Sequence, residues 1–176
     1  MASELIVQTL KGPTSGANAN KVIIPSGQTL ECANAIMAPG SILQTSTGLF
    51  TTNQQTGSTS FVDTEITKTL TAVGTNSKFH ITVVVGLNLY YNIRADYRLV
   101  QRISGNDVAL QTNILFSPYD NNSNTDTIGA ITYIDSPSLS AGSDVTYMIQ
   151  VRQTSGEFLY VGDNQDSSLS IMEIAG

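Results

Sequence analysis

Short apolar segments separated by turn-forming residues are the feature that most restricts what this chain can fold into. Segments rich in Val, Ile, Thr, Tyr and Phe alternate with polar clusters such as GTNS, SGND and TSGE. No window of a dozen residues has apolar residues at the i, i+3, i+4, i+7 spacing of an amphipathic helix. Runs of β-branched and aromatic residues bounded by Gly, Asn, Asp and Ser are typical of strands. The sequence therefore predicts an all-β protein, a sandwich or barrel rather than a parallel sheet covered by helices.

Alternation within these segments indicates which faces are buried. In VTYMIQVRQ, the apolar residues from Val145 to Val151 alternate with polar or mixed ones, as in a sandwich strand with one solvated face. We expect strands at Ser41–Thr45, Ser58–Asp63, Glu65–Leu70, Lys78–Leu89, Asp96–Ile103, Val108–Ile114, Thr127–Ile134, Val145–Gln153, Glu157–Val161 and Ser167–Ile174.

Two segments, FHITVVVGLNLYY and the terminal SSLSIMEIAG, are apolar on both faces. Chain ends are commonly polar and frayed, so an apolar terminal run indicates a buried strand. In a small sandwich, a strand with two apolar faces needs a second cover, which another subunit can supply. Glu173 in the terminal strand would pair with Arg98, Arg102 or Lys78, or form a ring about a threefold axis. The residues expected at the subunit interface are Val83, Val85, Leu169, Ile171, Met172 and Ile174.

The first 36 residues differ from the remainder of the chain. ELIVQTL and KVIIPSGQTLE are short strand-like pieces, and the connector KGPTSGANAN between them has no apolar core residues. A segment this short needs another surface to pack on. Pro39-Gly40 then marks a break in the chain. We predict an N-terminal arm over residues 1–36, which serves either attachment to another particle component or contact between subunits, and one folded domain over residues 37–176.

The composition restricts the partners of the protein. Charged residues make up 12% of the chain, about half of the ~25% typical of soluble domains, and 40 Ser and Thr residues take their place. The net charge is −6 and Lys and Arg form no cluster, which argues against nucleic acid and anionic membranes as partners. No apolar run approaches the ~20 residues of a membrane span. The N-terminus lacks the pattern of a signal peptide, so we expect synthesis in a cytoplasm without signal-peptide secretion.

The residues that usually carry catalysis are sparse. Cys32 and His80 are each the only residue of their type, and a hydrogen-bonded, packed histidine is the better interpretation of His80. The carboxylates of Asp63 and Glu65, or of Asp135 and Asp144, form an acid–base pair only if a cleft brings them together. No phosphate-binding loop, dinucleotide fingerprint or G-x-S-x-G motif occurs. We expect no enzymatic activity and no cofactor.

The stretch YDNNSNTDT offers a weak candidate metal site, and VGDNQDSS, with Asp163 and Asp166, offers a weaker one. The oxygen-bearing residues of YDNNSNTDT alternate as at the start of a calcium loop, but Thr125 and Ile131 stand where an EF-hand has Gly and Glu. A solvated turn is the better interpretation. The tyrosines at 90, 91, 97 and 119 either contact carbohydrate or, more commonly, close the ends of a sandwich core. The candidate calcium ligands are Asp120, Asn122, Asn124 and Asp126.

The order of the segments resembles that of a known group of proteins. IPSGQTL, APGSILQ, FVDTEITKTLTAVGTNSKFHITVVV, YRLVQRISGND, YIDSPSLSAGSDVTYMIQVRQTSG and the terminal SLSIMEIAG resemble small virion proteins of marine and cyanobacterial tailed phages. In these proteins an arm precedes a knob similar to the jelly rolls of the tumour-necrosis-factor (TNF) type, and the knobs are generally homotrimers. This chain departs from long tail fibres because it has no helical or repetitive shaft.

The resemblance implies a fold and a non-enzymatic structural function. The expected fold is an antiparallel, TNF-like jelly-roll sandwich preceded by the arm. The expected function is a homotrimeric decoration or short head-fibre protein on the virion surface, attached to the major capsid protein or a tail component. The residues expected to attach the arm to the virion are Leu5, Val7, Leu10, Val22, Ile23 and Ile24.

Two other functions are compatible with the same fold. A short tail fibre would bind host surface polysaccharide through distal loops that include Asp120–Asp126 and Asp163–Asp166. A secreted lectin-like or cytokine-like domain would be expected to carry a signal peptide. Native mass and co-sedimentation with capsids or with host cells separate the two phage functions.

Overall fold

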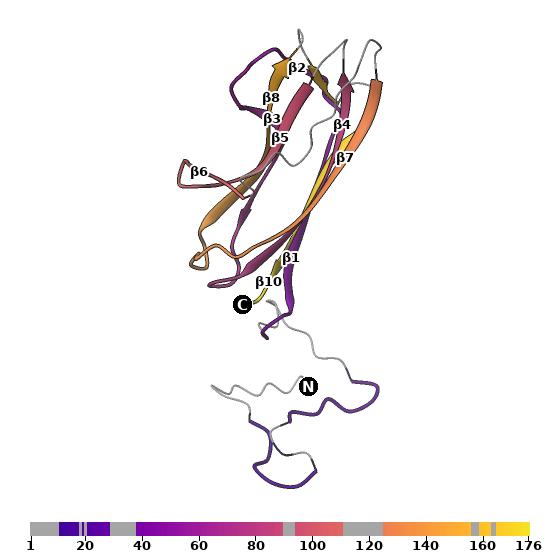
Figure 1. Ribbon diagram of the computed structural model, residues 1–176. Helices are drawn as coiled ribbons and strands as arrows, with labels where there is room; N and C mark the ends of the chain where they lie inside the picture. Colours follow the sequence, from indigo (N-terminus) through magenta and orange to yellow (C-terminus); the bar gives the residue numbers. More distant parts are fainter. Residues whose placement is uncertain are drawn as a thin grey trace, which may run out of the picture. The chain divides into compact units, whose positions relative to one another are not determined.

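The computed structural model describes residues 11–17, 19, 21–28, 38–89, 94–110, 125–155, 159–162 and 165–176. The chain divides into two units, Met1–Ala35 and Ile36–Gly176. In the second unit, two antiparallel sheets face each other across an apolar core (Figure 1). The prediction of an all-β, antiparallel protein is confirmed.

The ten strands belong to two sheets. The six-stranded sheet has the order β1-β10-β4-β9-β2, and β7 pairs with the other edge of β4. The four-stranded sheet has the order β3-β8-β5-β6. The strands are β1 Ile42–Phe50, β2 Gln54–Thr56, β3 Val62–Thr71, β4 Lys78–Leu89, β5 Arg94–Ile103, β6 Asn106–Ala109, β7 Thr125–Asp135, β8 Asp144–Ser155, β9 Leu159–Val161 and β10 Ser167–Ile174.

Alternation places one apolar set of each central strand in the core. The alternate apolar residues of β4 from Phe79 to Leu87 are buried, and those of β8 from Val145 to Val151 are fully buried opposite them. The rings of Phe79 and Tyr147 join the two sheets at a centroid distance of 5.8 Å. Burial of side chains of this size stabilises the fold by about 1.5–3 kcal/mol each.

The structure corrects several of the sequence-based strand assignments. The strand expected at Ser41–Thr45 runs on to Phe50, and the one expected at Val108–Ile114 begins at Asn106 and ends at Ala109. Ser58–Asp63 and Glu65–Leu70 were expected as two strands, but Val62–Thr71 is one strand with a register shift between Asp63 and Thr67. The polar strand β2 was not predicted because its three residues lack apolar alternation. Residues 21–28 form no strand, whereas KVIIPSGQTLE was expected to be strand-like.

The turn between β5 and β6 follows directly from its sequence. Ile103 pairs with Asn106, so the connection has only two residues, Ser104 and Gly105. Their φ values are 50° and 80°. Two consecutive positive φ values match the type I′ hairpin, in which glycine carries no steric penalty.

The terminal strand β10 is held between β1 and β4, and a buried carboxylate fixes its end. Glu173 is fully buried and accepts hydrogen bonds from the backbone N–H groups of Val73 and Gly74 at 2.9 Å. The side-chain amide of Gln44 donates a further bond at 2.6 Å. Glu173 is therefore bound to the β3–β4 turn of its own subunit, which corrects the expectation of an arginine, a lysine or a threefold ring as its partner.

The environment of Glu173 favours the ionised form. Burial alone would raise the pKa of this carboxyl, but the hydrogen bonds from Gly74, Val73 and Gln44 outweigh burial and lower the pKa below its usual value. The negative charge thus contributes to the stability of the fold at neutral pH.

Candidate functional site

The candidate calcium ligands are not brought together in the described part of the structure. Asp120, Asn122 and Asn124 lie outside the described residues. The Asp126 carboxylate accepts a hydrogen bond from the Asn88 amide at 2.9 Å. Among the described residues, no group of His, Cys, Asp or Glu has the arrangement of a metal site.

Three of the four candidate acid–base residues each have a separate structural partner, and the fourth, Glu65, is exposed on β3. Asp63 forms an ion pair with Arg102 at 3.0 Å. The Asp135 carboxylate accepts hydrogen bonds from the Tyr147 hydroxyl at 2.7 Å and from the Gln101 amide. Asp144 accepts a bond from the Thr71 hydroxyl at 2.6 Å. These contacts assign structural roles to the three carboxylates.

Of the candidate tyrosines, one is described and lies in the core. Tyr97 is buried in the core, where its apolar surroundings raise the pKa of the hydroxyl. Cys32 and the tyrosines at 90, 91 and 119 lie outside the described residues. In the part of the chain that the structure describes, no helix is both long and apolar enough to cross a membrane.

The expected interface residues divide between the two faces of the six-stranded sheet. The side chains of Met172 and Ile174 lie on the outer face, away from the core, and are half-buried. The other four are at most 3% exposed within the single chain, so a partner subunit cannot reach them. This corrects their assignment: Leu169, Ile171, Val83 and Val85 belong to the core of the sandwich.

Among the described residues of β1, β10, β4 and β7, the outer face of the six-stranded sheet carries no Asp, Glu, Lys or Arg between Lys78 at one end and Asp126 at the other. We call this surface the neutral face. Alternation and strand register assign it four residues from β1, four from β10, three from β4 and four from β7. These are Ile42, Thr45, Thr47 and Leu49; Ser168, Ser170, Met172 and Ile174; His80, Thr82 and Val84; and Ile128, Ala130, Thr132 and Ile134.

The largest exposed side chains lie on the two border strands of the neutral face. Ile42 and Leu49 on β1 are 56% and 66% exposed, and Ile128 and Ile134 on β7 are 59% and 60% exposed. Four strands about 4.8 Å apart, with eight residues rising about 3.4 Å each, cover roughly 400–500 Å². The apolar side chains make up only part of this area, and they stand mainly at its two borders.

The central strands of the neutral face have shorter, hydroxyl-bearing side chains. The register aligns Thr47, Ser170, Thr82 and Thr132 in one row across all four strands. The hydroxyls of Thr47 and Ser170 are 3.1 Å apart and hydrogen-bonded. The neighbouring row carries Met172, His80 and Ile134, which are longer. His80 thus lies on the outer face and is half-buried, rather than in the core.

The difference in side-chain length creates a hollow over β1, β10 and β4. Its volume is about 260 Å³. Sequence reasoning missed this feature because the strands come from distant parts of the chain. The residues that line it are Thr45, Thr47, His80, Thr82, Ser170, Ile171 and Met172.

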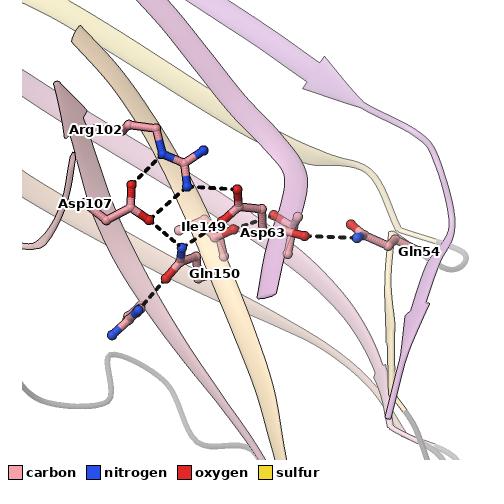
Figure 2. Close-up of polar contacts among 8 residues, drawn as sticks. Gln54, Asp63, Arg102, Asp107, Ile149 and Gln150 are labelled. Carbon is pink, nitrogen blue, oxygen red and sulfur yellow. Dashed lines mark hydrogen bonds and ion pairs between the residues drawn. The ribbon is translucent and has the colours of Figure 1, made fainter. Parts of the chain in front are cut away.

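The opposite sheet carries the charges that the neutral face lacks. All four arginines of the chain lie on β5 and β8 of the four-stranded sheet. Figure 2 shows one cluster, in which Arg102 bridges Asp107 and Asp63, and the Gln150 amide donates to both carboxylates. The hydrogen bond and charge of Arg102 lower the pKa of Asp107. The cluster is paired internally and partly exposed, as expected of a solvated face.

A second ion pair on this sheet is more deeply buried. The Asp96 side chain is 1% exposed and accepts two bonds from the Arg152 guanidinium, both at 3.0 Å. The Arg98 and Arg152 guanidinium groups also lie over the Phe61 ring, at 4.1 and 4.7 Å from its centroid. Removal of Arg152 therefore affects both a buried carboxylate and an aromatic contact.

We expect Arg152→Ala to lower the free energy of unfolding by roughly 1.5–3 kcal/mol, the range for hydrogen bonds to charged groups. Arg102→Ala is the comparison. It should lower the free energy of unfolding by less, because water screens the partly exposed ion pairs of Arg102 with Asp63 and Asp107. Urea unfolding at a fixed protein concentration measures both losses. The assignment of Asp96 as the more dependent carboxylate is wrong if Arg102→Ala is the more damaging change.

Comparison with known proteins adds no family assignment. No family model matches the sequence, and no curated protein matches it significantly.

Proposed function

We propose that this chain is a non-enzymatic structural protein of a tailed-phage particle, a homotrimeric decoration or short head-fibre protein with a jelly-roll knob. The neutral face is the structural observation that carries the assembly part of this proposal. The virion assignment rests on the segment resemblance, from IPSGQTL to SLSIMEIAG.

The distribution of charge supports assembly through the neutral face. Each chain has a net charge of −6, so two copies repel each other wherever acidic surfaces meet. The neutral face brings no carboxylate toward a second copy except at its Asp126 end. Burial of its exposed aliphatic side chains against a partner stabilises the complex by about 25 cal/mol per Å² of apolar surface removed from water. A neutral, aliphatic surface thus suits a partner of the same kind.

The arm supplies the second part of the proposed mechanism. Val22, Ile23 and Ile24 are 50%, 54% and 43% exposed. Consecutive exposed aliphatic residues suit a docking contact with the capsid. A trimer carries three such arms on one particle. Once the first arm has bound, the second and third arms are held close to their own binding sites, which raises their effective concentration there. Weak individual contacts then give firm attachment.

Co-sedimentation tests the virion assignment. We expect the full-length protein to have the native mass of three subunits and to pellet with empty capsids of the parent phage. Replacement of Val22, Ile23 and Ile24 by Ser should abolish pelleting without changing the native mass, because the arm is not the subunit contact. Val108→Ser is the matched control, since Val108 is also exposed, at 52%, but lies on β6.

The contrary results have distinct meanings. Pelleting with host cells instead of capsids would favour a receptor-binding tail fibre. Equal capsid binding by the triple variant would remove the arm from the mechanism. A monomeric full-length protein would contradict the proposed assembly.

A further inference from the structure

We infer that the hollow over β1, β10 and β4 accepts an aliphatic side chain from β7 of a second copy. This inference rests on the proposed homotrimer and names the residues of its subunit contact. The donors are Ile128 and Ile134, and the acceptor residues include Thr82 and Ser170.

The symmetry of a trimer requires two different, complementary patches. In a closed ring of three, each contact is heterologous, so one part of a subunit meets another part of the next. The neutral face provides both parts. Its centre has short hydroxyl side chains and a hollow of about 260 Å³, whereas its borders carry protruding aliphatic side chains.

Strand order identifies β7 as the donor border. β1 supplies Thr45 and Thr47 to the rim of the hollow, so the large residues of β1 are neighbours of the acceptor in the same subunit. β7 lies on the far side of β4, and neither Ile128 nor Ile134 lines the hollow. At 59% and 60% exposure, both isoleucines are available to another chain.

The chemistry of the hollow favours an uncharged, aliphatic occupant. The hydroxyls of Thr47 and Ser170 are hydrogen-bonded to each other. The threonine methyl groups and Met172 supply apolar surface. No Lys, Arg, Asp or Glu lines the hollow, and His80 is the one titratable residue in its lining. The exposed isoleucines of β7 match this surface, and a second copy supplies them.

Disulfide cross-linking tests the pairing directly. In a Cys32→Ser background, the double variant Ile134→Cys, Ser170→Cys should form covalently closed trimers under oxidation, visible on non-reducing gels. Each single-cysteine variant should stay uncross-linked, because a heterologous contact does not bring two copies of one residue together. Dimers formed by either single variant would show a twofold contact and overturn the inference.

A non-covalent test fills the hollow. Thr82→Leu should shift the native mass from three subunits toward one, with at least a tenfold loss of association. Thr67→Leu is the matched control on the opposite sheet and should leave the mass unchanged. An unchanged circular-dichroism spectrum of Thr82→Leu shows that the subunit still folds.

The results separate this inference from the proposed function. A trimer that resists Thr82→Leu and yields no 134–170 cross-link would overturn the hollow as the contact but keep the trimer. A wild-type monomer would overturn the trimer itself. If the wild type is monomeric and deletion of the arm causes aggregation, the arm of the same chain covers the neutral face instead.

Discussion

Met172→Glu should convert the proposed trimer into folded monomers. Met172 lies between Thr45 and His80 on the neutral face, with no Lys or Arg beside it in the strand register. A glutamate placed there would lose its water on assembly without gaining a Lys or Arg as its ion-pair partner. Leaving a charge buried and unpaired costs about 3–5 kcal/mol, or more than a hundredfold in the association constant.

The substitution should leave the subunit intact. Met172 is on the outer face, so the glutamate side chain stays in water while the chain is monomeric. Native mass by light scattering measures assembly, and far-ultraviolet circular dichroism checks the fold. Thr67→Glu introduces the same charge on the outer face of the four-stranded sheet and should remain trimeric. If both variants remain trimeric, the neutral face is not the subunit contact.

Glu173→Ala should destabilise the subunit by about 3 kcal/mol. The substitution leaves the buried N–H group of Gly74 and the partly buried N–H group of Val73 without their acceptor, and an unsatisfied buried group costs about 1–3 kcal/mol. It also removes a partner of Gln44 and opens a cavity beside the end of β10. Urea unfolding of the monomeric Met172→Glu protein measures the loss without a contribution from assembly.

Two comparisons make this prediction specific. Glu65 is exposed on β3, so Glu65→Ala should change the free energy of unfolding by less than about 0.5 kcal/mol. Glu173→Gln retains an acceptor oxygen and should cost less than Glu173→Ala. Equal effects of the substitutions at Glu65 and Glu173 would contradict the structural role of the buried carboxylate.

Because the pKa of Glu173 is lowered in the folded protein, the stabilisation that this residue provides depends on pH. Its folded-state pKa is lowered from the usual value, so the unfolded chain binds the proton more tightly. The stabilisation is fully present above the unfolded pKa of about 4.3 and is lost as the pH falls through the folded pKa. Glu173→Gln should therefore show a smaller loss of stability below pH 4 than the parent protein.

The sequence alone located strands where apolar, β-branched runs follow clear turn residues. The bounds Lys78–Leu89 and Ser167–Ile174 were predicted as the structure has them, and each segment begins directly after a polar cluster, GTNS or GDNQD. It also predicted that the terminal strand is buried. β2 was missed because a three-residue polar strand is held by its pairing with β9 and has no signal of its own.

Only the tertiary structure decided which face of the terminal strand points inward. Alternate residues of a strand point to opposite faces, so Leu169 and Ile171 lie on one face and Met172 and Ile174 on the other. Both sets are apolar, so the sequence does not show which face is buried. The inward set includes Glu173, which a pattern of hydrophobicity would have excluded from a core. Its burial is possible because the distant β3–β4 turn supplies two N–H donors.

The hollow has the same origin. Thr47, Thr82, Thr132 and Ser170 are separated by dozens of residues, and each is an ordinary strand residue in the sequence. Strand order and register bring them into one row. Because their side chains are shorter than those of the neighbouring row, the surface is hollowed there. The sequence by itself therefore determined that this chain forms amphipathic strands, because alternation is local. The neutral face and its hollow were decided by pairing between distant segments, which local patterns do not encode.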